Sequence, residues 1–568
     1  MMDKIEDHES RHSSTSLKSV DNADNQTSAQ RVPPPETPEA IQTRFRVIAA
    51  FWAVIIFLGF PIWWKTTSIY RAHLPIQEMT EWSEGKICRP VFPLEIQIAA
   101  PALQLTESQH LVRTTQHALD DLNEFAAHHL RLKLANATDL SDSGGPVLGG
   151  QNTGDGPDTA LTVRVLSEDG LSSPRSELHA ETTQLDIFYP PSQVPVPSSS
   201  NPALSVFIAE ELQRLYSEEK ATIAYILSGG TSGPDAESIS RRLRRSMKYA
   251  DTYHLSFSLF TPGAAPTSWD IEAAVQEYLA PLLFAFTPIS NFTIDTQVQM
   301  YATFSPMAPP PVFDEVESAW TLKKEDLSAF INAAEWPLNP SIGNGPTLNF
   351  VLYVPDPSQS PMVVKENRAS SWIIPQWGGV FLLNPPLETT DSSGSRTNPA
   401  HLSQDSLRPA FMTFSHQLLT LLGTPATPSS LPLRLQSLIR VRAAALLLSA
   451  SSTMGSLARL TESLPSIPIP ATVAASVAKT LSQLSATCSH LREGRFGAAL
   501  ASARIAESEA ERSFFEKSMV GQVYFPDEHK VAVYLPLLGP VGVPLIVGLM
   551  KEVKRLVAAW KARRLSKA

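Results

Sequence analysis

The chain has 568 residues, 43% of them hydrophobic and 18% charged, and its formal net charge at pH 7 is −10. This length suffices for two or three domains with hydrophobic cores. The acidic balance excludes nucleic acid as a partner, because binding a polyanion requires clustered Lys and Arg. Two cysteines are too few for a disulfide-rich scaffold.

The N-terminal region consists of a polar tail and an apolar run. Residues 1–43 have too little apolar surface to fold, so we expect a disordered tail. The uncharged run over residues 47–64, flanked by Arg44 and Arg46, predicts a first transmembrane helix over residues 44–64. A cleaved signal peptide does not fit, because a long polar tail precedes the run and Trp63 and Trp64 occupy the place of small residues. These two tryptophans are typical of an interfacial anchor in membrane lipid.

A second apolar run lies near the C-terminus. Residues 531–550 carry no charge, and residues 551–568 hold seven bases and one acid. An excess of Lys and Arg beside a span keeps that side in the cytosol. With two spans, both termini are therefore expected in the cytosol, and residues between them are expected across the membrane.

Prolines and glycines interrupt this second run. They include Pro536, Gly539, Pro540 and Pro544. One interpretation is a kinked span packed against other membrane helices, because backbone groups freed by Pro need partners in lipid. The other is an extended lead-in over residues 534–542, with a helix starting near Val543. Both suit a segment that lies against a partner.

Between the spans, the hydrophobic pattern predicts two regions and a short connection. Residues 65–430 alternate between strand and helix patterns, which indicates a mixed α/β domain. The strands expected there cover residues 91–100, 160–166, 183–188, 254–260, 292–304, 347–354 and 372–383. Residues 431–520 lack strand signals and predict a helical subdomain of three helices, divided at residues 465–470 and 494–497. Residues 521–530 form a juxtamembrane segment.

Histidines and cysteines offer few candidates for a metal or catalytic site. A helix starting at Thr106 would place His110, His117 and His128 on one face. At ~1.5 Å per residue they lie roughly 10 and 16 Å apart along the axis, too far for one ion. Cys488 and His490 point in different directions on a helix and do not form a catalytic pair.

Several common catalytic motifs do not occur in the chain. Phosphate-binding Gly-rich loops, Gly-x-Ser-x-Gly and His-Glu-x-x-His are all missing from the sequence. Asp270 and Glu272 follow Thr267 and Ser268 at a predicted helix start, where acids are favoured by capping and by the helix dipole. We therefore assign no catalytic, cofactor-binding or metal-binding residue.

The expected luminal segment offers sites for covalent modification. Asn136 and Asn291 each begin an Asn-x-Thr acceptor pattern for glycosylation. Asn25 fits the same pattern but lies in the expected cytosolic tail. Cys88 and Cys488 both fall in the luminal part and could pair, although nothing in the sequence fixes their distance.

Two long motifs resemble a known family. Residues 60–75, FPIWWKTTSIYRAHLP, and residues 523–540, VYFPDEHKVAVYLPLLGP, are similar to signatures of the PIG-S family. Shorter motifs fall between them in the family's order: Trp269-Asp270-Ile271, Gln376-Trp377-Gly378-Gly379 and Leu421-Leu422-Gly423. The resemblance implies a subunit of the GPI transamidase in the endoplasmic reticulum membrane. It also implies that this subunit is non-catalytic and needs no cofactor, since the cysteine-protease chemistry of that complex resides in another subunit, PIG-K.

Two other classes of protein compete with this interpretation. One is a membrane-tethered luminal enzyme acting on carbohydrate, with scattered acids such as Asp270 in the reaction. The other is a membrane-bound adhesion or receptor protein, which the low cysteine count disfavours, because extracellular modules usually carry more disulfides.

Overall fold

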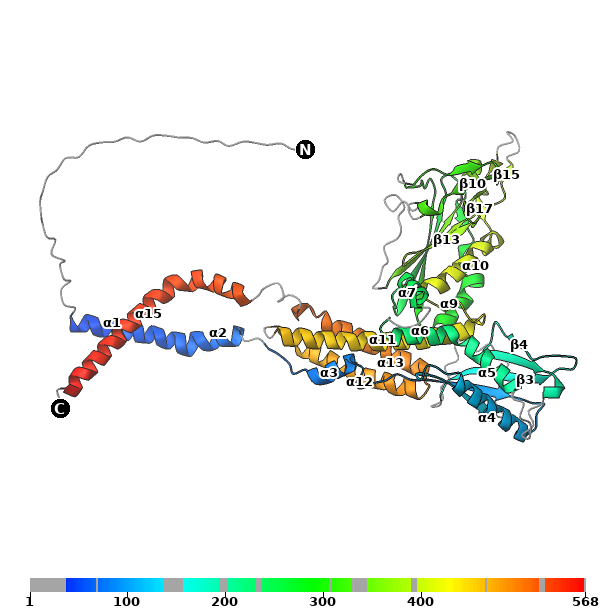
Figure 1. Cartoon of the computed structure of the whole chain (residues 1–568). Coiled ribbons are helices and arrows are strands. Elements are labelled where there is room, and N and C mark those ends of the chain that lie inside the picture. Colours follow the sequence, from blue (N-terminus) through cyan, green and yellow to red (C-terminus); the bar gives the residue numbers. More distant parts are fainter. Residues whose placement is uncertain are drawn as a thin grey trace, which may run out of the picture. The chain divides into compact units, whose positions relative to one another are not determined.

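The computed structural model describes residues 37–67, 70–135, 157–193, 203–230, 236–305, 308–327, 330, 345–389, 396–464, 467–519 and 527–565 (Figure 1). The chain divides into two compact units. The terminal unit is Met1–Ser68 with Phe525–Ala568, and the central unit is Ile69–Tyr524.

The terminal unit begins with a helix that is longer than the sequence predicts. It comprises α1 (Pro38–Val54), the π-helical turn η1 (Ile55–Gly59) and α2 (Phe60–Thr67). Residues 38–43, predicted as part of a disordered tail, are helical, with Pro38 in the first turn, where its missing N–H costs nothing. The π-helical turn precedes Pro61, whose ring and missing N–H disturb the regular bonding pattern. Among the described residues, Pro38–Lys65 is long and apolar enough to cross a membrane.

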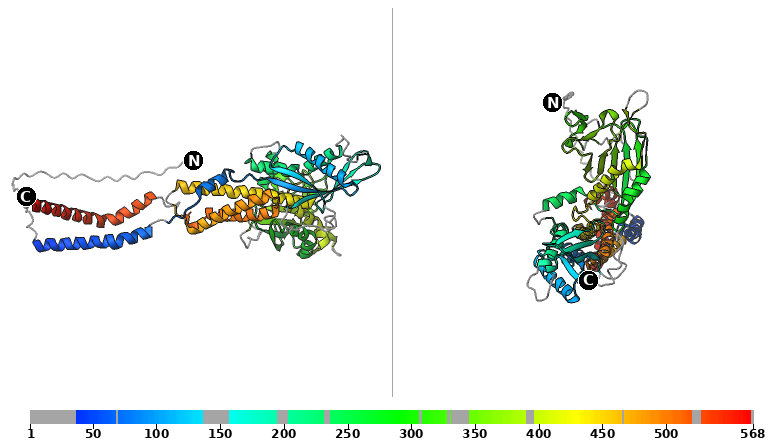
Figure 2. Two further views of the ribbon diagram at one scale, coloured as in Figure 1. Left: turned by 90° about the horizontal axis from the view of Figure 1, so that it is seen from below. Right: turned by 90° about the vertical axis from the view of Figure 1, so that its right-hand side faces the viewer.

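The second helix of this unit is α15 (Asp527–Leu565), which continues through Pro536, Pro540 and Pro544. Figures 1 and 2 show it as a curved helix. The predicted alternative of an extended lead-in over residues 534–542 is therefore wrong. The basic segment 551–565 continues the same helix.

The central unit contains two lobes, each built on a five-stranded sheet. The first lobe has the strand order β2-β1-β3-β5-β4, with β1 (Phe92–Ala99), β2 (His128–Leu134), β3 (Thr159–Ser167), β4 (Arg175–Leu178) and β5 (Gln184–Tyr189). All neighbouring strands pair in parallel except β4, which is antiparallel to β5. Helices α4 (Leu105–Asp121) and α5 (Ala203–Leu215) accompany this sheet, and η2 (Pro191–Gln193) follows β5.

The second lobe has the strand order β13-β14-β11-β6-β8. Its strands are β6 (Thr252–Phe260), β8 (Asn291–Gln299), β11 (Thr347–Tyr353), β13 (Ser371–Ile374) and β14 (Gly378–Leu382). The helical segments α8 (Ile271–Ala274), η3 (Val275–Leu279), α9 (Ala280–Phe286) and α10 (Gln404–Leu421) cover one face of this sheet. The other face packs against a small sheet of β9 (Val312–Asp314), β10 (Ala319–Leu322) and β12 (Met362–Val364).

Short elements complete the second lobe. They are β7 (Ser268–Trp269) paired with β17 (His401–Leu402), β15 (Glu388–Thr389) paired with β16 (Arg396–Thr397), η4 (Lys324–Asp326) and η5 (Pro357–Gln359).

The two sheets repeat one connection pattern. In each, a central strand leads through a helical segment to a parallel edge strand, from β1 to β2 and from β6 to β8. The chain then returns to the other side of the central strand, at β3 and at β11. A further parallel strand follows with an antiparallel edge strand beside it, which is β5 with β4 and β14 with β13. The lobes are thus two copies of one α/β topology.

A helical bundle holds the lobes together. It comprises α3 (Ile76–Ser83), α11 (Leu431–Ser463), α12 (Ala471–Arg492) and α13 (Phe496–Phe514), and the last three match the predicted helices and breaks. Helices α6 (Ser217–Leu227) and α7 (Ala236–Arg245) connect the lobes along the chain. The start of α11 contributes Leu433 to the core of the first lobe and bundle, and Leu435 and Leu438 to the core of the second lobe.

Several sequence predictions are wrong in detail. The helix that starts near residue 106 ends at Asp121, and His128 and Leu130 belong to β2, where alternating side chains suit an edge strand. The strand predicted over 372–383 is a hairpin, because the chain turns at Gln376 with a positive φ of 58°.

Candidate functional site

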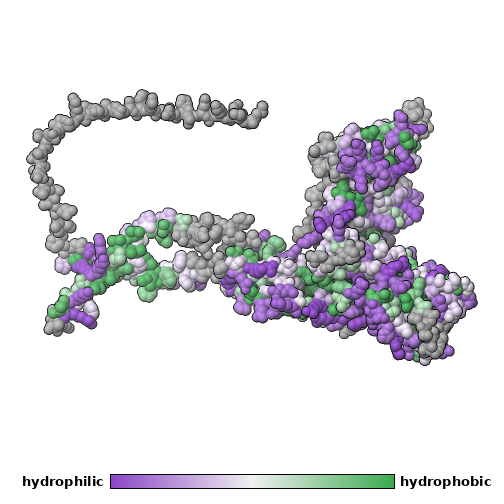
Figure 3. Space-filling view, viewed as in Figure 1, coloured by the Kyte–Doolittle hydropathy of each residue, from purple (hydrophilic) through white to green (hydrophobic). Residues whose placement is uncertain are grey.

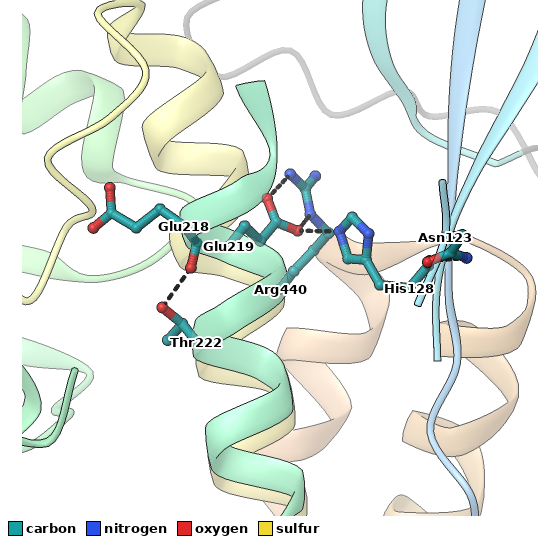
Figure 4. A network of polar contacts seen from close by, with 6 residues as sticks. All are labelled: Asn123, His128, Glu218, Glu219, Thr222 and Arg440. Atoms are coloured by element: carbon teal, nitrogen blue, oxygen red, sulfur yellow. Dashed lines mark hydrogen bonds and ion pairs between the residues drawn. The ribbon is translucent and has the colours of Figure 1, made fainter. Parts of the chain in front are cut away.

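A buried ionic cluster joins the first lobe to the bundle (Figure 4). Arg440 on α11 donates two hydrogen bonds to Glu219 on α6, at 2.6 Å from Nε and 2.7 Å from Nη2. His128 Nε2 on β2 lies 3.4 Å from the same carboxylate. All three residues are at most 3% exposed. The cluster therefore links three elements far apart in the sequence through one carboxylate.

Aromatic rings complete the surroundings of Arg440. Its guanidinium carbon lies 5.3 Å from the ring centre of Phe496 and 6.0 Å from that of Tyr216. Burial alone would raise the pKa of Glu219, but the Arg440 guanidinium outweighs burial and holds the pKa of this carboxyl well below its ordinary value. Glu219 is thus a permanently ionised partner of Arg440. An acid held in this form cannot donate a proton near neutral pH.

The neighbouring carboxylate, that of Glu218, contacts α7 and the segment between α10 and α11. Glu218 contacts the Arg242 guanidinium of α7 and accepts hydrogen bonds from the backbone N–H groups of Ala426 and Thr427, at 3.2 and 2.9 Å. Glu218 and Glu219 are consecutive on α6, so their side chains leave the helix in different directions. The two carboxylates thereby connect α6 to β2 of the first lobe, to α11 of the bundle, to α7 and to the segment between α10 and α11. These contacts make the junction a structural site.

A Ser–His–Asp arrangement lies on the second lobe. Ser268 Oγ is 2.9 Å from His401 Nδ1, and His401 Nε2 is 3.1 Å from Asp270 Oδ1. Ser268 and His401 are direct register partners of β7 and β17. The side chains of His401 and Asp270 are 49% and 45% exposed, so water surrounds the group. Activation of a hydroxyl nucleophile depends on a shielded, preorganised site, which this exposed arrangement does not provide.

Asp270 has a clear structural role in this arrangement. Its Oδ2 accepts a hydrogen bond of 3.3 Å from the backbone N–H of Gln404, the first residue of α10. Asp270 also precedes α8, as the sequence predicts, but its side chain makes no capping bond to α8. Its carboxylate caps the start of a different helix. Glu272 lies exposed on α8, so the two acids do not form a catalytic pair.

The Gln376–Gly379 motif is explained by close packing. A Cβ at Gly378 would overlap the backbone of Asn349 on β11, and a Cβ at Gly379 would overlap the side-chain oxygen of Gln417 on α10. Gln376 closes the end of α7 by donating its side-chain amide to the carbonyl of Arg244 at 2.7 Å. The glycines therefore let β14 approach its neighbours, and the motif is architectural.

The other predicted site residues are placed as follows. His110 and His117 lie on α4 and His128 lies on β2, so the three do not share a helix face. The described residues contain no group of three or more His, Cys, Asp or Glu that could hold a metal ion. Cys88 and Cys488 are bonded to each other, with their Cα atoms 6.2 Å apart, and tie the segment before β1 to α12. Asn291 is exposed at the start of edge strand β8, whereas Asn136 and Asn25 lie outside the described residues.

The terminal unit brings the start of the first apolar helix to the end of the second. Arg44 Nε on α1 donates to Glu552 Oε1 on α15 at 2.8 Å. One helical turn earlier on α15, Gly548 faces Ile48, whose Cδ1 lies 3.6 Å from the position of an added Cβ. Further residues predicted to contact membrane or partners are exposed, namely Trp63, Trp64, Pro536, Pro540 and Pro544. A Cβ at Gly539 would meet open space.

Sequence reasoning did not single out Glu219, Arg440 or Ser268 as interacting residues. Arg440 carries the one usable signal, since it stands in the Ala- and Leu-rich stretch that becomes α11. An arginine in such a stretch suggests a buried partner, but Arg434 and Arg442 share the stretch, and 221 residues separate Arg440 from Glu219.

Comparison with known proteins covers nearly the whole chain. A family model described as PIG-S, phosphatidylinositol-glycan biosynthesis class S protein, matches residues 50–559. The human protein named GPI-anchor transamidase component PIGS is 27% identical over 547 residues, covering 91% of this chain and 96% of the human one. The Schizosaccharomyces pombe protein named GPI transamidase component PIG-S homolog is 27% identical over 544 residues, covering 93% and 87%. GPI transamidase component GPI17 of Saccharomyces cerevisiae is 24% identical over 528 residues, covering 89% and 91%.

Proposed function

This chain belongs to the PIG-S family, and we propose that it acts as a non-catalytic subunit of the GPI transamidase in the endoplasmic reticulum membrane. That complex cleaves a C-terminal signal from a proprotein and joins the new end to the ethanolamine of a GPI lipid. The observation that carries the proposal is similarity over nine-tenths of the chain to relatives that are named as transamidase components.

The chemistry of the described residues supports a non-catalytic role. Glu219 and His128 are buried in an ionic cluster at a junction of three elements. Ser268, His401 and Asp270 lie exposed on the surface, and Asp270 caps α10. This position of Asp270 does not favour the alternative of a carbohydrate-active enzyme. We place the cysteine-protease chemistry in another subunit, PIG-K.

Two observations support a two-span topology with both termini in the cytosol. The Arg44–Glu552 ion pair joins the start of one apolar helix to the end of the other, as antiparallel spans require. The basic segment that follows residue 550 fits the cytosolic side. Residues 65–530 would then be luminal, with the α/β lobes in 65–430 and the helical subdomain in 431–520. A Cys88–Cys488 disulfide and glycans on Asn136 and Asn291 suit that compartment.

We further propose that α15 docks against other subunits. Three prolines within the helix leave backbone carbonyls without their usual partners, and in lipid such groups need partners from neighbouring helices. Exposed Pro536, Pro540 and Pro544 and the open space at Gly539 leave room for close helix contact.

Complementation tests the proposed function. Cells that lack their own PIG-S subunit should regain GPI-anchored reporter proteins at the surface when they express this chain. The control is a chain truncated before α15, which is expressed at the same level in the same cells in place of the full chain. If the full chain is made, reaches the endoplasmic reticulum and restores no anchored reporter, the proposal fails.

A further inference from the structure

The C-terminal segment 551–565 carries an interaction surface beyond the membrane span. It is the last part of α15 and is helical throughout, so at ~1.5 Å per residue it extends roughly 22 Å past residue 550. Apart from Glu552, every residue in it is exposed within the described structure. Figure 3 shows hydrophilic and hydrophobic side chains gathered at this end of the terminal unit.

Apolar residues lie along one side of this helical segment. Val553, Leu556, Val557 and Trp560 follow the spacing i, i+3, i+4, i+7, which places them on a single face. Each is between 47% and 54% exposed. The Arg564 guanidinium carbon lies 3.8 Å from the centre of a Trp560 ring, so one cation accompanies the apolar face.

Cations occupy the remaining surface. Lys551 and Arg555 lie on the side opposite the apolar face, Lys554 and Lys561 lie along one flank of it, and Arg563 and Arg564 follow near the end. The one acid of the segment, Glu552, is 5% exposed and paired with Arg44 of α1. That pairing removes the negative charge from the outer surface. The segment therefore presents an apolar stripe bordered by positive charge.

This combination fits the surface of an anionic bilayer. A helix with a cationic face and an apolar face containing Trp lies in the interface, with the apolar side chains at the acyl boundary. Polybasic segments beside a span are attracted to anionic lipid head groups. The segment is tethered to the bilayer by the helix before it, so no separate recruitment is needed.

We propose that residues 551–565 bind the cytosolic leaflet through anionic lipid head groups, with Val553, Leu556, Val557 and Trp560 turned into the bilayer. The cytosolic location rests on the proposed two-span topology. The lipid contact requires only that the preceding part of α15 lies in a bilayer, and it then depends on charge and on the apolar face, whichever leaflet the segment meets.

Fluorescent labelling of the full chain tests this proposal. Single cysteines are introduced as Val557→Cys on the apolar face and Ala558→Cys, its neighbour on the cationic side. Each is labelled with an environment-sensitive dye without reduction, so that Cys88 and Cys488 stay bonded, and unmodified chain controls for dye uptake. The labelled chains are placed in nanodiscs of phosphatidylcholine alone or of phosphatidylcholine with phosphatidylserine. Both leaflets of a nanodisc are accessible, so the result is independent of topology and of other subunits.

In nanodiscs with phosphatidylserine, nitroxide-labelled lipid should quench the dye at position 557 several-fold more than at 558. Replacing one of the four cations Lys551, Lys554, Arg555 and Lys561 by Gln should lower the ratio of lipid-bound to unbound segment about fivefold. Equal quenching at the two positions would overturn the proposal. A difference in quenching between the two positions that is equally large without phosphatidylserine would also overturn it. A difference that appears only when other subunits are present would overturn it as well, because it would indicate a protein partner.

Discussion

Arg440 and Glu219 form a two-bond ion pair in which both side chains are almost completely removed from water. The pair joins α11 of the bundle to α6, and His128 extends it to β2 of the first lobe. Because neither charge has access to bulk solvent, each depends on the other for its stabilisation.

Replacing Arg440 by Met should destabilise the protein by about 3–5 kcal/mol, since the Glu219 carboxylate would remain buried without its partner. Arg459→Met on the same helix is the control, because Arg459 is exposed, and its loss should cost no more than about 0.5 kcal/mol. Thermal unfolding of the purified chains in detergent measures the difference. Similar midpoints for the two variants would show that the buried pair is unimportant for stability.

The same pair predicts the sign of a pH effect. The pKa of Glu219 is lowered in the folded state, so its stabilising contribution is fully present above its ordinary value of about 4.3 and is lost as pH falls toward the folded value. The difference in unfolding midpoint between the original chain and Glu219→Gln should stay constant from neutral pH down to about 5.5 and shrink only below about pH 4.3. A difference that disappears near pH 6 would contradict this assignment.

Asp270→Ala distinguishes a capping role from a catalytic one. Loss of the bond to Gln404 should lower stability by about 0.5–2 kcal/mol, as for other caps, and leave GPI attachment per folded molecule unchanged. Glu272→Ala, in an exposed position on the adjoining helix, should change neither quantity. The measurements are thermal unfolding and surface display of a GPI-anchored reporter. A stable Asp270→Ala chain without attachment would point to chemistry at this acid.

Gly379→Ala should destabilise the second lobe by about 1–3 kcal/mol, because the new methyl group would overlap the Gln417 side chain. Gln417 is buried and donates to the carbonyl of Trp372 at 3.1 Å, so it cannot move away without losing that bond. Gly497→Ala is the matched control, since it lies in α13 with open space around an added Cβ. That change should be neutral or stabilising by up to about 1 kcal/mol. The reverse order of the two midpoints would rule out the packing explanation.

The sequence predicts the fold where local patterns are strong. Alternation over residues 254–260 identifies β6, and helical spacing from Leu433 onward identifies α11. The same reasoning fails at His128, where an apparent helical period continues past the true end of α4 at Asp121. Period alone cannot show that β1 offers an open edge with which residues 128–134 can pair.

Contacts between distant segments could not be predicted. Glu219 and Arg440 are 221 residues apart, and Ser268 and His401 are 133 residues apart, so only the tertiary fold brings them together. The shared strand order of the two sheets is likewise invisible in the sequence, because different side chains fill the two cores. For Asp270, the sequence predicts a capping role at the helix that follows it, α8. The structure shows a cap, but on α10, which lies far along the chain beyond the β7–β17 strand pair.

Glycosylation should occur at Asn136 and Asn291 and not at Asn25, if the central unit is luminal. The exposure of Asn291 at the start of an edge strand leaves room for a glycan. Glycosidase treatment should increase gel mobility, and the double variant Asn136→Gln, Asn291→Gln should abolish that shift. A shift that persists in the double variant, or that requires Asn25, would contradict the topology.

Replacing residues 531–550 by an unrelated poly-leucine span tests whether α15 is a docking element. The substitution removes three prolines and three glycines but keeps the apolar length. Membrane insertion and luminal folding should be preserved, because hydrophobicity alone supports a span. Co-purification of other subunits and GPI attachment should both fall. Unchanged assembly would mean that the span is only an anchor and that the central unit holds the complex.

The most direct test of the account is to purify the tagged full chain from membranes in mild detergent and to identify the proteins that accompany it. The account predicts the other GPI transamidase subunits, among them the catalytic PIG-K, in constant ratio to this chain. It also predicts that the purified assembly attaches GPI to a proprotein. The account would be contradicted if the chain purified without these subunits and if cells that lack the chain still attached GPI normally.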